Sequence, residues 1–371
     1  MTLTKFAQRF TCSPSPISPF HGMPPELIDL IIDHAHADRS LLAACSLVCK
    51  AWFPAARYHL FSNTKLNVQN ALSFVHLIES TSSTVSPFVR HIDAKDNCEG
   101  GRWVDDLFLN LTSLPYITSI SLTSSCDAPL SQITLFTLCS FDRLVELRLA
   151  ECEFRDFTEV QQLICSFPML EILYLEADWP EPRTIDLTDA SPSPYLRELY
   201  LRCEMSHVLE WFLLQPSVAP VSKLTLHGLD SIDLPVVSRY LRRLGPALTH
   251  LIIPRIGSVV DSLSDHLDLS LNACLRYLKL GIDSDVAYLS MARTLLSQLD
   301  SPFFEEVELS LYSVRQSPKV ARYWTDLDTL LTGPHFPSMK RATVSAMSAV
   351  SLAKEVLPLC HERGVLQVQH H

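Results

Sequence analysis

Glycine is scarce in this chain, with nine residues among 371. Loops that hold phosphate groups and the strained turns of catalytic sites depend on glycine. None of the patterns G-x-S-x-G, G-x-G-x-x-G, G-x-x-x-x-G-K-[ST] or H-E-x-x-H occurs in the sequence. We therefore expect no catalytic residues and predict that the protein is not an enzyme.

Other residues that could carry chemistry are few. The acidic pairs Asp105–Asp106 and Glu305–Glu306 are expected at solvated ends of helices or strands. His34 and His36 would point in different directions on a helix, and no cysteine nearby completes a tetrahedral zinc site. We expect neither a metal nor a cofactor.

Clusters of Lys and Arg are also missing, and the net charge is -11 at pH 7. Binding to nucleic acid requires clustered cations that neutralise phosphates. Arg242-Arg243 and Lys340-Arg341 are only pairs. The sequence therefore predicts that nucleic acid is not a partner.

Long hydrophobic runs are absent, since no stretch approaches the roughly 18 apolar residues that span a bilayer. We expect no membrane partner. The 11 cysteines form no C-x-x-C pair, and several, such as Cys45, Cys139 and Cys165, stand at apolar positions. They are interpreted as buried reduced thiols of a cytoplasmic or nuclear protein.

The pattern of residues 23–61 indicates short helices. Pro24 and Pro25 stand where the first turn of a helix tolerates proline, and Asp38 or Ser40 can cap a second helix. The first helix presents one apolar face: Leu27, Ile28, Ile31 and Ala35. The second repeats apolar residues at helical spacing: Leu41, Leu42, Cys45, Val48, Cys49 and Trp52.

This stretch holds more large apolar side chains than so small a bundle can bury. They are Leu27, Ile28, Leu30, Ile31, Ile32, Leu41, Leu42, Leu47 and Val48. The surplus predicts an exposed patch that a partner covers.

The same stretch resembles an F-box, the helical module that docks a protein onto the Skp adaptor of a cullin ubiquitin ligase. The matching segments are Met23-Pro24, Glu26-Leu27-Ile28, Leu41-Leu42 after Asp38, and Val48-Cys49-Lys50-Ala51-Trp52. The resemblance implies a Skp-type adaptor and, through it, a cullin scaffold as partners. The residues that it implies for adaptor binding are Pro24, Leu27, Ile28, Ile31, Leu41, Leu42, Cys45, Val48, Cys49 and Trp52.

Two positions depart from the family pattern. Met23 replaces the usual leucine, and Ala35 stands where a larger aliphatic residue is common. Both changes remove volume from an apolar face without adding charge. An alternative interpretation is that the helices only cap the end of a repeat array, because terminal repeats need a polar outer face.

The rest of the chain contains a repeat in which short leucine-rich strands recur. Equivalent strand positions lie between 24 and 35 residues apart, at Ala94, Leu122, Leu149, Leu175, Leu201, Leu226, Ile253, Leu280, Leu309, Val344 and Val368. Helices are expected between the strands, at 71–79, 103–111, 157–165, 236–244, 285–299 and 349–361.

This spacing resembles that of irregular leucine-rich repeats, such as those beside F-boxes in fungal proteins. It implies an α/β fold, a curved solenoid with a parallel sheet on the concave face and helices on the convex face. We expect a disordered leader at 1–20, an F-box-like helical module at 21–62 and the solenoid at 63–371. The Asn or Cys that bonds the turn backbone in this family is present only at Cys152.

Two segments interrupt the repeat. Residues 179–194 contain four prolines and predict an extended loop in place of a helix, and residues 312–324 predict an insertion. The second segment is either a binding element or an inert surface loop. A hydrolase site at the proline-rich loop is the least favoured alternative.

On the strands, residues between the buried leucines point outward. Arg148, Tyr174, Tyr200 and Arg202 are the candidate target-binding residues, because tyrosine and arginine are frequent anchors of protein interfaces. The alternative is that the tyrosines stack only for stability. The sequence thus predicts a substrate receptor of a Skp-cullin-F-box ubiquitin ligase, or else a protein-binding scaffold without ligase function.

Overall fold

The computed structural model describes residues 23–81, 83–97, 103–126, 128–180, 191–256, 259–283, 285–312, 318–346 and 354–369. The chain divides into two compact units, Met1–Arg148 and Leu149–His371. The expected leader at 1–20 lies outside the described residues.

The first unit begins with three helices, α2 (Pro25–His34), α3 (Arg39–Val48) and α4 (Phe53–Phe61). Pro25 occupies the first helical position of α2. The Asp38 carboxylate caps α3, because it accepts hydrogen bonds from the backbone N–H groups of Ser40 at 2.9 Å and Leu41 at 3.0 Å. The predicted group of short helices is confirmed.

The second of these helices is shorter than predicted. It ends at Val48, because the backbone of Cys49 is extended, with φ -162° and ψ 169°. Trp52 is the residue that precedes α4, and Pro54 stands in the first turn of that helix. A helix continuing from α3 would place Pro54 in its interior, where proline lacks the N–H that the helix needs. The prediction of one helix through Trp52 is therefore wrong.

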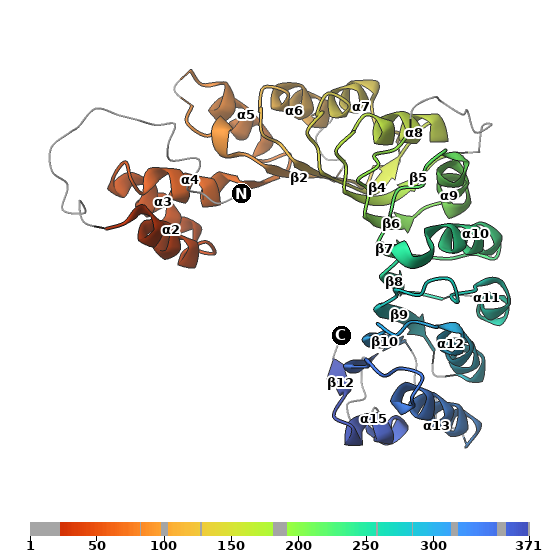
Figure 1. Cartoon of the computed structure of the whole chain (residues 1–371). Helices are drawn as coiled ribbons and strands as arrows, with labels where there is room; N and C mark the ends of the chain where they lie inside the picture. Colours follow the sequence, from red (N-terminus) through yellow and green to blue (C-terminus); the bar gives the residue numbers. More distant parts are fainter. Residues whose placement is uncertain are drawn as a thin grey trace. The chain divides into compact units, whose positions relative to one another are not determined.

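Alternating strands and helices follow the three helices in the first unit. They are β1 (Asn63–Leu66), α5 (Ala71–Glu79), the short 3-10 turn η1 (Ser86–Phe88), β2 (His91–Asp96), α6 (Trp103–Leu111), β3 (Ser119–Ser124), α7 (Gln132–Leu138) and β4 (Glu146–Glu153), which runs into the second unit. Strands β1, β2 and β3 pair in parallel. In Figure 1, helices α5, α6 and α7 follow one another along one side of these strands.

The second unit continues the alternation. Its elements are α8 (Phe157–Cys165), β5 (Ile172–Asp178), β6 (Glu198–Arg202), α9 (Met205–Leu214), β7 (Lys223–Leu226), α10 (Leu234–Leu244), η2 (Gly245–Ala247), β8 (His250–Ile253), α11 (Val260–His266), β9 (Tyr277–Ile282), α12 (Val286–Gln298), β10 (Glu306–Leu311), α13 (Pro318–Thr332), β11 (Arg341–Ala346), α15 (Pro358–Glu362) and β12 (Leu366–Gln369). The strands from β5 to β12 pair in parallel, and helices α9 to α13 lie on one side of them (Figure 1).

The register of the strands confirms the repeat. Residues that the sequence marks as equivalent are direct partners across neighbouring strands. They form the rows Leu66, Ala94 and Leu122, then Leu175 and Leu201 beside Leu226, then Ile253, Leu280, Leu309, Val344 and Val368. Strand order follows chain order throughout. The chain is therefore an α/β protein with a leucine-rich-repeat-like solenoid, as predicted.

The predicted helices agree closely with α5, α6, α8, α10 and α12. The insertion predicted at 312–324 is wrong for its second half, because Trp324 lies inside α13 and is 2% exposed. The long spacing before β11 reflects this 15-residue helix. Most of the proline-rich loop, residues 181–190, lies outside the described residues, as do 313–317 and 349–353.

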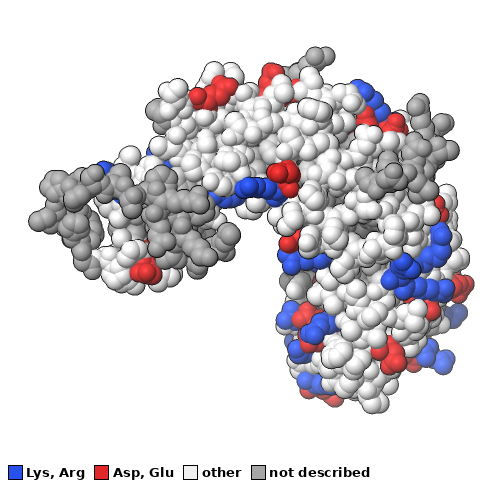
Figure 2. Space-filling view, turned by 45° about the horizontal axis from the view of Figure 1, so that its top comes forward, with Lys and Arg blue, Asp and Glu red and all other residues white. Residues whose placement is uncertain are grey.

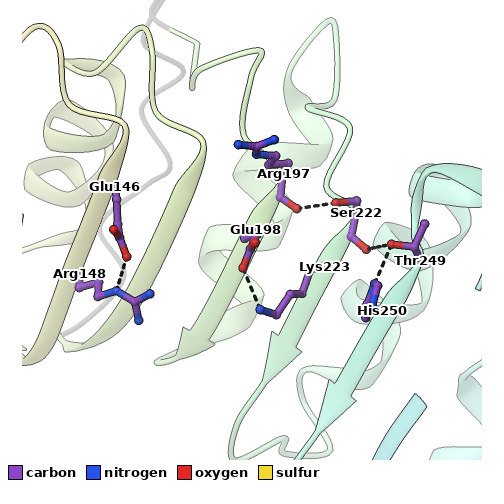
Figure 3. A network of polar contacts seen from close by, with 8 residues as sticks. All are labelled: Glu146, Arg148, Arg197, Glu198, Ser222, Lys223, Thr249 and His250. Atoms are coloured by element: carbon purple, nitrogen blue, oxygen red, sulfur yellow. Dashed lines mark hydrogen bonds and ion pairs between the residues drawn. The ribbon is translucent and has the colours of Figure 1, made fainter. Parts of the chain in front are cut away.

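Neighbouring repeats are joined by carbonyl groups that accept two hydrogen bonds at the starts of strands β2 to β4 and β6 to β11. The Ser222 carbonyl accepts from the N–H groups of Thr249 at 2.8 Å and His250 at 2.9 Å. The Arg197 carbonyl accepts in the same way from Ser222 and Lys223, at 2.9 and 3.0 Å. Hydroxyl groups of Ser222 and Thr249 donate to the same two carbonyls (Figure 3). These bonds recur between neighbouring repeats, and they do not require the Asn or Cys that bonds the turn backbone in leucine-rich repeats.

Buried polar side chains make further links between repeats. The Asn272 amide donates to the carbonyls of Leu241 at 3.0 Å and Gly245 at 2.9 Å, where α10 ends. Asp105 accepts a hydrogen bond from the Thr134 hydroxyl at 2.6 Å and is 6% exposed. The expectation that Asp105 is solvated is wrong, because two repeats close over it.

The cysteines differ in part from the expectation. Among the cysteines in the described part of the chain, eight are free, including Cys45, Cys139 and Cys165. Burial raises the pKa of the Cys165 thiol to about 11. Cys126, however, is disulfide-bonded. The interpretation of all cysteines as reduced thiols therefore fails at Cys126.

Asp328 provides a test of the links between repeats. Its buried carboxylate accepts hydrogen bonds from the N–H groups of Leu359 at 2.7 Å and Cys360 at 2.9 Å, at the first turn of α15. Asp328→Ala leaves both N–H groups without this acceptor, and we expect the free energy of unfolding to fall by about 2–4 kcal/mol in urea titrations. Asp326→Ala, on the same helix, breaks only a surface ion pair with Arg293 and should cost under about 0.5 kcal/mol. Equal losses in the two variants would contradict this role of Asp328.

Candidate protein-interaction surfaces

The three N-terminal helices pack around a small apolar core. The buried residues are Ile28, Ile32, Leu42, Cys45, Ala55, Ala56 and Leu60, with Met23, Ala35, Trp52 and Phe61 partly buried against them. Ile28, Leu42 and Cys45, which the F-box resemblance implies for adaptor binding, are therefore internal and can act only by supporting the surface. Met23 and Ala35 also pack on this core, so their departures from the family pattern alter packing inside the helices.

The other large apolar side chains of these helices face solvent. Leu27 is 48% exposed, Ile31 45%, Leu41 48% and Val48 49%, and all four are among the implied adaptor-binding residues. Pro24 is exposed, while Cys49 and Trp52 are partly exposed. The predicted surplus of apolar side chains at the surface is confirmed.

Two exposed residues were missing from the implied adaptor set. Leu47 is 80% exposed and Leu30 is 55% exposed. Both are among the large apolar side chains that the sequence places in this stretch in excess of what a small bundle can bury. That excess was the signal that could have added them to the adaptor-binding set. Burying a fully exposed leucine is worth about 1.5–3 kcal/mol, so covering these side chains would contribute substantially to the binding of a partner.

Helical spacing groups the exposed residues. On α2, Leu27, Leu30 and Ile31 form an i, i+3, i+4 stripe. On α3, the exposed sector consists of Leu41, Ala44, Leu47 and Val48, which fall within about 120° around the helix axis. Residues 41–48 contain no charged side chain. We call this sector the α3 apolar face.

Polar contacts between the helices hold the α3 apolar face in place. The His59 ring nitrogen lies 2.7 Å from the Asp33 carboxylate, which links α4 to α2. The Arg39 guanidinium donates to the Leu60 carbonyl at 3.3 Å, which links α3 to α4. Hydrogen bonds from the Leu41 N–H and the Ser40 side chain lower the pKa of Asp38, so the cap of α3 stays ionised at neutral pH. A partner would meet a preformed surface.

The second unit presents a different surface, the exposed face of its sheet. Outward-facing residues align across the strands in the row Tyr174, Tyr200, Thr225, Ile252, Lys279, Glu308, Thr343 and Gln367. The sequence predicted an outward orientation for the first six, but Thr225 is buried, with 8% of it exposed, as is Thr343 with 4%. Aromatic, apolar and charged side chains are therefore presented in one line.

Three of the four candidate target-binding residues come together at one end of this row. The rings of Tyr174 and Tyr200 stack with their centroids 3.8 Å apart and their planes at 12°. The Tyr174 hydroxyl donates to Glu176 at 2.9 Å, and the Arg202 guanidinium lies 2.5 Å from the other carboxylate oxygen. Burial, together with Tyr200 and Glu176, raises the pKa of Tyr174 well above its usual range. We call Tyr174, Glu176, Tyr200 and Arg202 the tyrosine patch.

Arg148, the fourth candidate residue, belongs to the other unit. Its guanidinium lies 2.5 Å from the Glu146 carboxylate on the same strand (Figure 3). The grouping of Arg148 with the tyrosine patch stays a prediction.

A second polar group lies further along the row, around Glu308. Its carboxylate accepts a hydrogen bond from the Tyr277 hydroxyl at 2.6 Å and lies 2.8 Å from the Lys279 ammonium. Burial alone would raise the pKa of Glu308, but the hydrogen bonds from Lys279 and Tyr277 outweigh it and hold the pKa below the ordinary 4.5. The sheet face here is a preorganised ionic network.

The described residues show little that could hold a metal or cross a membrane. They contain no group of three His, Cys, Asp or Glu side chains placed to bind a metal ion. His34 is exposed, and the His36 ring nitrogen lies 2.6 Å from the Asp33 carbonyl. Within the described part, no helix has the length and apolar character needed to span a bilayer. Figure 2 shows Lys and Arg interspersed with Asp and Glu on the face in view.

Comparison with known proteins adds one structural likeness. No family model matches the sequence, and no curated protein matches it. Among solved structures, a chain in the crystal structure of the Rad7 and Elc1 complex in yeast is similar, with 14% sequence identity and a TM-score of 0.41. The match covers 100% of this chain and 96% of that chain. The assignment of the fold rests on the strand register and the helices described above.

The network around Glu308 makes a prediction about pH. Because the folded-state pKa of Glu308 is lowered, its ionised form stabilises the fold above the ordinary value of 4.5, and this stabilisation is lost as the pH falls below that value. Glu308→Gln should lower the thermal midpoint at pH 7, and the difference from wild type should narrow towards pH 3. Glu306→Gln, whose partner Arg341 is 3.5 Å away at the surface, is the control and should change little. A difference for Glu308→Gln that is constant from pH 7 to pH 3 would contradict this assignment.

Proposed function

We propose that this chain is the substrate-receptor subunit of a Skp-cullin-F-box type ubiquitin ligase. The observation that carries the proposal is the α3 apolar face, together with the Leu27, Leu30 and Ile31 stripe of α2. These side chains belong to helices whose sequence resembles an F-box, and they are exposed in fixed positions at the surface. A Skp-type adaptor would cover them and connect the chain to a cullin.

In this proposal the sheet of the second unit holds the target protein. The tyrosine patch offers two stacked rings and an arginine in a fixed arrangement, which suits an anchor of a protein interface. The proposal assigns no catalytic group to the chain itself. It acts by bringing the target near a ubiquitin-conjugating enzyme, so catalysis depends on proximity. Such a receptor would work in the cytoplasm or the nucleus.

A second candidate function is a protein-binding scaffold whose N-terminal helices only cap the repeats. Contacts of α4 and its C-cap residue Ser62 with the segment that leads into β2 favour this function. Phe53 of α4 contacts Phe88 with ring centroids 6.4 Å apart. The Ser62 carbonyl accepts hydrogen bonds from the N–H groups of Arg90 at 3.2 Å and His91 at 2.8 Å. Binding to an adaptor separates the two functions, because a cap would not bind one.

Adaptor docking is tested by replacing exposed residues of the α3 apolar face. Leu41→Asp with Val48→Asp introduces two charges where the adaptor would contact α3, so affinity for a purified Skp-type adaptor should fall at least about 100-fold by calorimetry. Both side chains are about half exposed, so the helices should stay folded. Leu42 is unsuitable, since it is fully buried and an aspartate there would unfold the module.

The matched control is Leu72→Asp with Leu109→Asp, two exposed leucines on α5 and α6. This variant should bind the adaptor like wild type. If wild type and the Leu41/Val48 variant bind equally, or if neither binds, the receptor function is excluded. The scaffold would then be the better explanation.

Target binding is tested at the tyrosine patch with the full chain as bait. Tyr200→Ala with Arg202→Glu removes the stack and reverses a charge, and at least one protein retained by wild type should fall about tenfold or more in quantitative mass spectrometry. Tyr195→Ala removes an exposed tyrosine outside the sheet face and is the control. Identical sets of retained proteins for all three baits would place target binding elsewhere.

A further inference from the structure

A cavity of about 610 Å³ lies beside the α3 apolar face, within the first unit. One wall is formed by the end of α3 and the start of α4, with Leu47, Phe53 and Pro54. The cavity is also lined by residues of the segment before β2, which are Ser83, Thr84, Pro87 and Phe88. The helical module and the segment that leads into β2 therefore build this cavity together.

The walls of the cavity are held by internal contacts. Phe88 is 5% exposed and meets Phe53 in an edge-on arrangement at 6.4 Å. The Arg57 guanidinium lies over the Phe53 ring at 4.9 Å. The Ser83 hydroxyl oxygen accepts a hydrogen bond from the Val85 N–H at 3.4 Å, and the Val85 carbonyl accepts from the Phe88 N–H at 2.9 Å. The cavity is thus present before any partner binds.

Leu47 makes the cavity continuous with the α3 apolar face. It is a wall of the cavity and also one edge of the face, and 80% of it is exposed. A protein that covers Leu41 and Val48 on α3 would therefore also contact Leu47, on the same helix, at the edge of the cavity. This continuity suggests one occupant for both surfaces.

We propose that this cavity is a second anchoring site for the Skp-type adaptor, and that it receives a bulky apolar side chain of the adaptor beside an acidic one. This inference rests on the proposed function and extends it. The docking surface would then include residues 83–88, outside the F-box-like helices, so the first repeat would contribute to adaptor affinity.

The chemistry of the cavity favours a protein side chain over a small polar ligand. Its lining is mainly apolar, and its serines are engaged within the chain. The Ser46 hydroxyl donates to the Ala43 carbonyl at 2.7 Å, and Ser83 bonds to the Val85 N–H. A small ligand would need several convergent polar groups to orient it. Apolar contact with a side chain of a protein needs none.

Lys50 indicates the charge of the partner at this site. It is exposed, lines the cavity, and forms none of the ion pairs found among the described residues. A carboxylate beside the inserted apolar side chain would pair with its ammonium group. Such a pair at the rim fixes orientation and association rate more than affinity.

The test measures adaptor affinity by calorimetry with the full chain. Thr84→Trp fills the cavity from an exposed position, and we expect the dissociation constant for a purified Skp-type adaptor to rise about tenfold or more. Lys50→Glu should slow association, with a smaller effect at high salt. Thr325→Trp, at an exposed threonine of α13, is the control and should leave affinity within about twofold. Thermal midpoints of all variants check that they fold.

The outcomes separate this inference from the proposed function. If the Leu41/Val48 variant loses the adaptor while Thr84→Trp and Lys50→Glu bind like wild type, the second anchoring site is overturned and the receptor function stands. If wild type does not bind the adaptor, both are overturned. If Thr84→Trp changes only the sedimentation of the chain alone, the cavity is a contact between copies of this chain, which also overturns the inference.

Discussion

The stacking of one repeat on the next is the constraint on which the structure depends. A single strand and helix cannot bury their apolar faces alone, so each repeat is stable only against its neighbours. The doubly accepting carbonyls at the strand starts, such as those of Arg197 and Ser222, fix each repeat in register with the next. Because this register is regular, outward-facing residues from successive strands align, and the tyrosine patch and the Glu308 network follow from it.

The N-terminal helices differ from the repeats in how many of their apolar side chains are buried. Their core is small, and seven buried side chains are enough to fill it. Both Leu27 and Ile28 are aliphatic, yet the first is 48% exposed and the second 4%. Packing within the module explains why its buried residues are apolar, but it does not explain why its exposed residues are apolar too. The proposed docking role would account for it, and the cavity beside Leu47 is lined in part by residues of the segment before β2.

The stabilising contacts and the proposed binding surface lie on different parts of the repeats. Asp105 and Asp328 are buried where helices of successive repeats meet, and Asn272 is buried in the loop before β9 against the end of α10. The charged residues of the sheet face are paired with one another, as in Lys279 with Glu308. Recognition through such a face uses side chains that are already ordered, which lowers the entropy lost on binding.

Much of the fold was determined by the sequence alone. The spacing of the leucines predicted the strand register, and helices α5, α6 and α8 agree with prediction, because buried positions recur with a regular period. The tertiary structure decided the rest. Helical spacing marks two adjacent apolar stripes on α2, and only packing against α3 and α4 determines that Ile28 and Ile32 lie inside while Leu27 and Ile31 face solvent. The burial of Asp105 and the cavity beside Leu47 join segments far apart in the chain, which local sequence patterns cannot relate.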